Sequence, residues 1–278
     1  MNPYVDTFFK VILPVLMIGI ITVVAQHWGP AVGGVLGAVP AKGGPILLFL
    51  AVEQGPHFAA TSAAASLGGA GGCGVFCLVY ARVCRRVGWP IAGLAAYGAF
   101  AVVWAVMLPI ASWGLPAALL AVFGILVVSR RLLPEAPVVA RRKGSTWSDL
   151  PARMIAGAGM VVFVTTVGPL FGATISGMLT TIPTVAAVLA LFTHAQEGPD
   201  RTIGVMRGMT HGLLGFAAFL TVIAATLVPL GILPAFALGI AAVVVVQLIE
   251  LRAALRSHRP APEVEAMPAG MEGLEAAD

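Results

Sequence analysis

The chain has 278 residues, of which 59% are hydrophobic and only 10% are charged. A water-soluble domain of this length carries many more charges on its surface, so the composition excludes a soluble protein and indicates an all-α protein of the membrane. The net charge of +4 gives no indication of nucleic-acid binding, because the basic residues lie beside apolar stretches, where they set topology and meet lipid headgroups.

Nine stretches are predicted to cross the lipid bilayer as helices. A membrane helix needs about 20 apolar residues to span a hydrocarbon core of roughly 30 Å, and each stretch approaches or exceeds that length. The sequence therefore predicts a polytopic, multi-pass membrane protein. In chain order the stretches cover residues 8–26, 31–52, 58–80, 90–108, 113–128, 152–170, 173–194, 203–228 and 234–251.

The basic residues of the predicted loops fall almost entirely on one side of the membrane. Of the 16 Lys and Arg residues, 13 lie on that side, whereas the other side receives only Lys10. Short basic loops stay in the cytoplasm, so we expect the cell inner (plasma) membrane, with the amino end outside and the carboxyl end cytoplasmic. The residues on the basic side are Arg82, Arg85, Arg86, Arg130, Arg131, Arg141, Arg142, Lys143, Arg153, Arg201, Arg252, Arg256 and Arg259.

An internal repeat is visible at an offset of 143 residues. HWGPAVGGVLGAVP, which ends at Pro40, aligns with LFGATISGMLTTIP, which ends at Pro183, and Gly55-Pro56 aligns with Gly198-Pro199. Each unit has four spans, and span 113–128 joins the units. That single additional span makes the second unit enter from the opposite face, as in inverted-repeat transporters. The predicted organisation is a first repeat over 1–110, a linking helix and cytoplasmic loop over 111–150, a second repeat over 151–252 and a disordered tail over 253–278.

The second unit reads IPTVAAVLALFTHAQEG from residue 182, followed by Arg207-Gly208 and a glycine-rich helix. This unit resembles the small four-helix GlpM-type inner-membrane proteins. They carry a similar Pro-Thr start, a His near the end of the second helix, and an Arg and a Gly in the third. The resemblance implies that this chain is a fused, doubled version of that architecture, and it implies no defined chemistry.

The second and seventh spans are predicted to be broken at the same depth. In the second span Pro40, Gly43, Gly44 and Pro45 lie close together, and proline and glycine pairs interrupt the helical hydrogen bonds. A new half-helix would begin at Pro45 with unpaired N–H groups that bind anions. The alternative is a simple proline kink, which membrane helices tolerate.

Lys42 lies within the first break, about 16 Å deep at 1.5 Å per residue. No carboxylate is expected in the membrane interior, since Glu53, Glu197 and Glu250 fall at span ends. Lys42 is therefore solvated, uncharged, or available to an anionic ligand, unless it snorkels to the surface. The predicted substrate-binding residues of the two breaks are Pro40, Lys42, Gly43, Gly44, Thr181, Pro183 and Thr184.

Polar residues at the ends of the two broken spans are predicted to form gates or to carry protons. One group follows the second span, an equivalent group ends the seventh span, and two further residues share a face of the eighth. The alternatives are ordinary interfacial residues for the two groups, snorkelling for Arg207 and a hydrogen-bonded packing role for His211. The residues are Glu53, Gln54 and His57; His194, Gln196 and Glu197; and Arg207 and His211.

These features predict a secondary active transporter of a small anionic or carboxylate-bearing solute that works by alternating access. Protons are the expected coupling ion, through His57, His194 or His211. The sequence has no Walker A motif, and we expect no enzyme activity, cofactor or bound metal. The partners are the lipid bilayer and the solute, and association into a homo-oligomer is left open.

Two other functions stay open. One is a structural or assembly subunit, whose glycine-rich faces bind partner helices. The other is an intramembrane metalloenzyme, in which His194 and Glu197, spaced as ligands on one helix, are joined by His211. Metal analysis would distinguish the second alternative, and tolerance of Lys42 replacement would favour the first.

Overall fold

The computed structural model describes residues 13–38, 43–111, 113–136 and 182–257, with short pieces at 151–152, 154–156 and 158–159. The described residues are almost entirely helical and contain no strand, which confirms the all-α class. The helices are α2 (Leu13–Trp28), α3 (Pro30–Gly37), α4 (Gly43–Glu53), α5 (Pro56–Val83), α6 (Trp89–Ala111), α7 (Leu115–Leu132), α10 (Thr184–Glu197), α11 (Pro199–Leu230) and α12 (Ile232–Ser257).

Five of these helices, α5, α6, α7, α11 and α12, are long and apolar enough to cross a membrane. They coincide with the predicted spans 58–80, 90–108, 113–128, 203–228 and 234–251, so the protein is embedded in a membrane. The remaining predicted spans lie wholly or partly outside the described residues or are divided into shorter helices. The count of nine spans therefore stays a prediction.

The outer faces of the long helices are apolar, as lipid contact requires. Leu94 on α6, Leu120 on α7 and Leu233 on α12 have exposed fractions of 79%, 79% and 82%. Exposed apolar side chains continue along α12 through Val244 and Ile249. Soluble monomers rarely present continuous apolar surfaces of this kind, whereas the hydrocarbon chains of a bilayer cover them.

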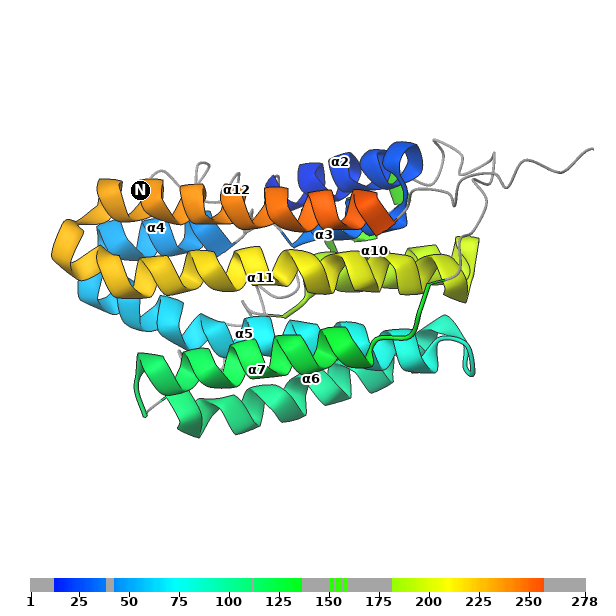
Figure 1. Ribbon diagram of the computed structural model, residues 1–278, viewed down its shortest axis with the longest axis horizontal. Helices are drawn as coiled ribbons and strands as arrows, with labels where there is room; N and C mark the ends of the chain where they lie inside the picture. The colour runs from blue at the N-terminus through cyan, green and yellow to red at the C-terminus, as the bar shows by residue number, and fades with distance from the viewer. Residues whose placement is uncertain are drawn as a thin grey trace, which may run out of the picture.

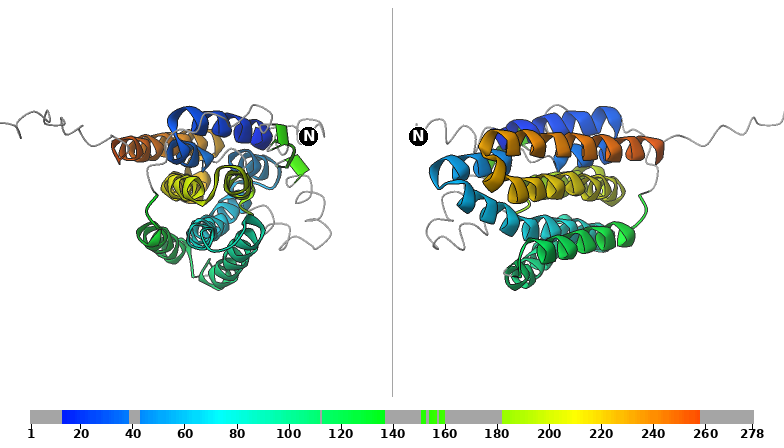
Figure 2. Two further views of the ribbon diagram at one scale, coloured as in Figure 1. Left: turned by 90° about the vertical axis from the view of Figure 1, so that its right-hand side faces the viewer. Right: turned by 60° about the vertical axis from the view of Figure 1, so that its left-hand side comes forward.

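The antiparallel pair α5 and α11 forms the centre of the bundle. The end of α5 lies beside the start of α11, where Arg85 pairs with Asp200. At the other end, Ala59 near the start of α5 shares a buried cluster with Leu227 near the end of α11. Helix α11 lies between a layer of α2, α3, α4 and α12 and a layer of α5, α6 and α7 (Figure 1). The view along the helices shows α6 and α7 far from α2 (Figure 2).

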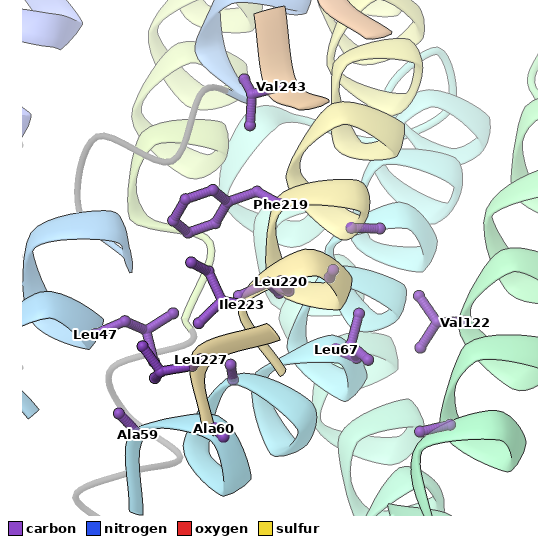
Figure 3. Close-up of a cluster of buried hydrophobic side chains, with 14 of the residues drawn as sticks. Leu47, Ala59, Ala60, Leu67, Val122, Phe219, Leu220, Ile223, Leu227 and Val243 are labelled. Atoms are coloured by element: carbon purple, nitrogen blue, oxygen red, sulfur yellow. The ribbon is translucent and has the colours of Figure 1, made fainter. Parts of the chain in front are cut away.

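Two buried apolar clusters hold these layers together. In the first, Phe219 and Ile223 of α11 lie near Leu47 of α4, and Leu67 of α5 faces Val122 of α7 (Figure 3). The second cluster packs Phe76 and Tyr80 of α5 with α6, with α10 and with the first turns of α11, including Met206. The clusters occupy opposite halves of α11, so this helix is buried along its length.

The described Arg residues gather at one end of the bundle. The ends of α5, α7 and α12 meet the start of α11 there (Figure 1). This gathering agrees with the expected separation of charge between the two sides of the membrane, while the orientation of the chain stays a prediction. The residues are Arg82, Arg85, Arg86, Arg130, Arg131, Arg201, Arg207, Arg252 and Arg256.

Helices α3 and α11 cross with their backbones in contact. A Cβ atom on Gly34 would lie 2.2 Å from the carbonyl oxygen of Val205, and one on Gly212 would lie 2.3 Å from the carbonyl oxygen of Val35. Both distances are shorter than any real contact, so each helix requires glycine where it meets the other. Small residues serve this purpose widely in membrane helix packing.

We expect Gly212→Ala to destabilise the protein by about 1–3 kcal/mol, because the added methyl group forces α3 away from α11. The measurement is the midpoint of thermal unfolding of the detergent-purified protein.

Gly124→Ala is the matched control, since nothing lies within 4 Å of a Cβ at this exposed position of α7. Alanine there should stabilise slightly, by about 0.5–1 kcal/mol. Equal melting temperatures for the two variants would contradict the close backbone contact.

Candidate functional site

The range predicted as the second span contains two helices instead of one. Helix α3 ends at Gly37 and α4 begins at Gly43, whereas Pro40 and Lys42 lie outside the described residues. The half-buried Gly43 and Gly44 lie against α11, where Cβ atoms on them would be 3.3 Å from Phe216 and 3.7 Å from Phe219. The start of α4 therefore packs against the middle of α11.

The second predicted break corresponds to the start of α10. Thr181 lies outside the described residues, and α10 begins at Thr184 directly after Pro183. Both residues are buried, and the Thr184 hydroxyl donates to the carbonyl of Ile182 at 3.3 Å. Helix α10 packs in the cluster of Phe76 and Tyr80, and α4 packs in the other cluster, so these two helix starts do not share one apolar core.

A buried carboxylate lies at the centre of the most polar contact between the long helices. Glu250 of α12 is 7% exposed. One carboxylate oxygen accepts from Arg130 Nη1 of α7 at 3.0 Å, and the other lies 2.5 Å from Nδ1 of His211 of α11. Three long helices thus contribute one charged side chain or imidazole each, and we call Arg130, His211 and Glu250 the polar triad.

Gln247 extends the polar triad by one turn of α12. Its amide nitrogen donates to the carbonyl of Gly212 at 3.0 Å, on the residue next to His211. Its Oε1 is buried and accepts no hydrogen bond from the described residues. Since an unpaired buried acceptor is costly in an apolar bundle, this oxygen is available to a donor on a ligand or water.

The face of α11 predicted to carry Arg207 and His211 is only partly shared. Arg207 donates to the carbonyls of Pro134 at 3.0 Å and Leu133 at 3.4 Å, just beyond α7. Thr210 is buried and donates within its own helix to Met206. Of Arg207, Thr210 and His211, only His211 contacts Glu250. It is therefore the one of these three that belongs to a titratable cluster.

The predicted gate residues at the end of α10 contact two other helices. His194 Nδ1 lies 3.2 Å from the hydroxyl of Tyr80 of α5, with the rings edge to face. Arg85 pairs with Asp200 at 2.8 Å. Glu197 pairs with Arg201 in the first turn of α11, and the exposed Gln196 lies on the same turn of α10. We call the Tyr80–His194 and Arg85–Asp200 contacts the clasp.

At the opposite end of the bundle the equivalent residues are open to the surroundings. Gln54 and His57 are exposed where α4 turns into α5, and the Glu53 side chain lies outside the described residues. The two predicted gates therefore differ: the clasp ties helices together at the basic end, and Gln54 and His57 protrude at the other.

The three residues considered as metal ligands have separate partners. His194 lies beside Tyr80, Glu197 beside Arg201 and His211 beside Glu250. Across the described ranges no group of three or more His, Cys, Asp and Glu side chains is placed to hold a metal ion. The described residues therefore provide no set of metal ligands for the metalloenzyme alternative.

The sequence did not reveal that Arg130 and Gln247 belong to this cluster. Glu250 was expected at a span end, and it lies two residues before Arg252, where the candidate membrane span of α12 ends, although the helix itself continues to Ser257. Gln247 and Glu250 are three residues apart, so the sequence alone places both on one face of a largely apolar helix. This spacing could have indicated a polar contact. In the sequence Arg130 resembles any other basic loop residue, and only the fold shows that it pairs with Glu250.

Protein-family models, curated proteins and solved structures contain no match to this chain. The similarity to GlpM-type proteins therefore stays a prediction.

We expect Arg130→Ala to destabilise the protein by about 1–3 kcal/mol, because it leaves the buried Glu250 without its guanidinium partner. Arg131→Ala, at the exposed neighbouring position, should change stability by less than about 0.5 kcal/mol. The measurement is thermal unfolding in detergent.

A double-mutant cycle isolates the pair. Glu250→Ala in the Arg130→Ala background should cost less than Glu250→Ala alone, with a coupling energy of about 0.5–3 kcal/mol. Additive effects would contradict a direct interaction.

Proposed function

We propose that this protein is a secondary active transporter that moves a small anionic or carboxylate-bearing solute by alternating access. The observation that carries the proposal is the position of the interruption between α3 and α4. It lies against the same turns of α11 that hold the polar triad and Gln247. Interrupted helices and polar side chains inside a membrane bundle characterise the substrate sites of secondary transporters.

Helix contacts support two equivalent halves, 1–110 and 151–252. Helix α4 packs on α5 and α12, and α10 packs on α11 and α6, which is the pairing expected when α4, α5 and α6 correspond to α10, α11 and α12. Gly55 and Gly198, which the repeat aligns, have φ of 92° and 91° before a proline. The antiparallel course of α5 and α11 supports an inverted relation.

Further support comes from the aligned glycines Gly72 and Gly215. A Cβ on Gly72 would touch Phe100 of α6, and one on Gly215 would touch Gln247 of α12. Each glycine thus faces the helix that follows its own in the chain. Two halves that share packing in this way can rock against each other around a common site.

The different states of the two ends support alternating access as the mode of transport. Such a carrier closes one gate while the other is open. At the basic end both contacts of the clasp are formed, Tyr80 with His194 and Arg85 with Asp200, while Gln54 and His57 are exposed at the opposite end. In the proposed cycle the clasp opens when the outer residues close.

Lys42 is proposed to bind the anion, together with Pro40, Gly43 and Gly44 at the start of α4. The contribution of Thr181, Pro183 and Thr184 stays a prediction, because the start of α10 packs in the other apolar cluster. A solute at about 100 times its Kd stabilises the folded state by about 2.7 kcal/mol, which is a rise in melting temperature of roughly 5–10 °C. We expect one of succinate, lactate, glutamate or inorganic phosphate to produce this rise, and Lys42→Met to abolish it. The measurement is thermal unfolding of purified protein with each compound.

Arg86→Met is the matched control, because it removes an exposed cation at the basic end and should leave the rise intact. A rise that persists in Lys42→Met would place the anion elsewhere. No rise with any compound, together with unchanged stability of Lys42→Met, would favour the structural or assembly subunit.

Cys84 reports the state of the clasp. Its thiol is 2% exposed at the end of α5, and burial raises the pKa of this thiol to about 11. At neutral pH the reactive thiolate is therefore depleted by about two orders of magnitude relative to an exposed thiol, and it forms as the pH rises toward 11. We expect His194→Ala to raise alkylation of Cys84 at neutral pH by about 2- to 10-fold, because a lost hydrogen bond of about 0.5–1.5 kcal/mol shifts local opening by that factor.

The rate of alkylation by N-ethylmaleimide is measured in protein with Cys73→Ala and Cys77→Ala, so that only Cys84 reacts. His57→Ala, at the opposite end, should leave the rate unchanged. Equal rates in all three proteins would remove the clasp as a gate.

A further inference from the structure

The polar triad lies between α7, α11 and α12 toward the basic end of the bundle, where Arg130 is in the last turn of α7. His211 is twelve residues beyond the start of α11, which is about 18 Å at 1.5 Å per residue. Glu250 is 7% exposed, and the side chains of His211 and Arg130 are 19% and 38% exposed. Glu250 is therefore the most buried member of the triad and Arg130 the most exposed.

Few charged groups face His211. Helix α12 presents Glu250, α7 presents Arg130, and Arg207 lies one turn away on α11 itself. Helix α3 carries no titratable side chain along its described length. Cys77 of α5 lies beside Thr210, the residue next to His211, whereas His194 of α10 contacts Tyr80 of α5. The charge of His211 is thus set by one carboxylate and two guanidinium groups.

The contact between His211 and Glu250 requires a proton. An ionised carboxylate only accepts hydrogen bonds, so at 2.5 Å either Nδ1 carries the hydrogen or the carboxyl group does. When Nδ1 carries the hydrogen, the imidazole is neutral and the carboxylate is ionised, so Arg130, Glu250 and His211 together have no net charge. A second proton binds the lone pair on Nε2 of a neutral imidazole that donates through Nδ1, and the triad then carries a charge of +1.

From this arrangement we infer that His211 and Glu250 form the proton-binding site that couples transport, with Arg130 as a fixed counter-charge. The inference rests on the proposed function and names its coupling ion. The added proton arrives from water on one side of the membrane, forms the N–H bond at His211 and leaves to water on the other side. No other bond is made or broken.

The charge of the triad explains why proton and anion travel together. An imidazolium beside Arg130 and Arg207 is unfavourable in an apolar bundle, whereas a solute with one negative charge restores neutrality. Gln247 lies beside His211, because its Nε2 donates to the carbonyl of Gly212, and its buried Oε1 accepts no hydrogen bond from the described residues. By reciprocity, the anion raises the affinity for the proton as much as the proton raises the affinity for the anion.

The first test needs no solute. In wild-type protein labelled with nitrogen-15 at histidine and scanned from about pH 9 down to about pH 5, the signals of His211, assigned with His211→Gln, should change from neutral imidazole to imidazolium as the pH falls. Glu250→Asp, which keeps the carboxylate, should retain this titration, whereas Glu250→Gln should displace it. A His211 that keeps one charge state throughout this range in wild-type protein would overturn the inference.

The second test measures proton uptake with a pH-indicator dye in weakly buffered protein when succinate, lactate, glutamate or inorganic phosphate is added. Wild type should take up about one proton per anion bound, as linkage requires, and His211→Gln and Glu250→Gln should take up almost none per anion bound. Undiminished uptake in both variants would overturn the proton site while leaving anion transport standing. Absence of anion binding in wild type would instead overturn the proposed function, and the titration of His211 would then still decide whether the site binds a proton.

Discussion

At the crossing of α3 and α11 two backbones touch, because Gly34 and Gly212 leave no side chain between them. This contact holds α3 against the middle of α11, so the interruption after α3 faces the same turns. The carbonyl of Gly212 accepts the amide of Gln247, which ties α12 to that turn as well. One glycine therefore joins three helices. It also positions the interrupted helix beside the polar triad, and the candidate site depends on that contact.

Polar groups in an apolar bundle must find partners inside it, since lipid offers none. The described structure meets this demand by placing its charges where helices meet: Arg85 with Asp200, Arg130 with Glu250, and Arg207 with the carbonyls after α7. Each contact joins helices that are distant in the chain. The charges that set the topology also tie the bundle together at its basic end. The polar triad is therefore itself one of the contacts that join helices toward that end.

Long apolar runs predicted α5, α6, α7, α11 and α12. Only a bilayer requires a helix of about 20 consecutive apolar residues, so the length and composition of these runs were sufficient. The Pro-Gly cluster predicted an interruption, and α3 and α4 are separate helices. The interaction partners of the polar residues could not be predicted in the same way. Arg130 and Glu250 are 120 residues apart, and each resembles an ordinary residue at a helix end. Hydropathy shows which segments cross the membrane but not which faces meet, so the sequence did not indicate that Glu250 is the partner of His211.

The aligned halves have similar packing but different chemistry. The repeat aligns His211 with Gly68, and a Cβ on Gly68 would lie 2.9 Å from the side chain of Met107. The contact between α5 and α6 is thus small, apolar and close, whereas the equivalent contact between α11 and α12 holds an imidazole, a carboxylate and an amide. In an inverted-repeat carrier the shared packing lets the halves exchange positions. In the proposed carrier, His211 has glycine as its aligned counterpart, so this position would supply one proton per transport cycle, set by the difference between the halves and not by the repeat.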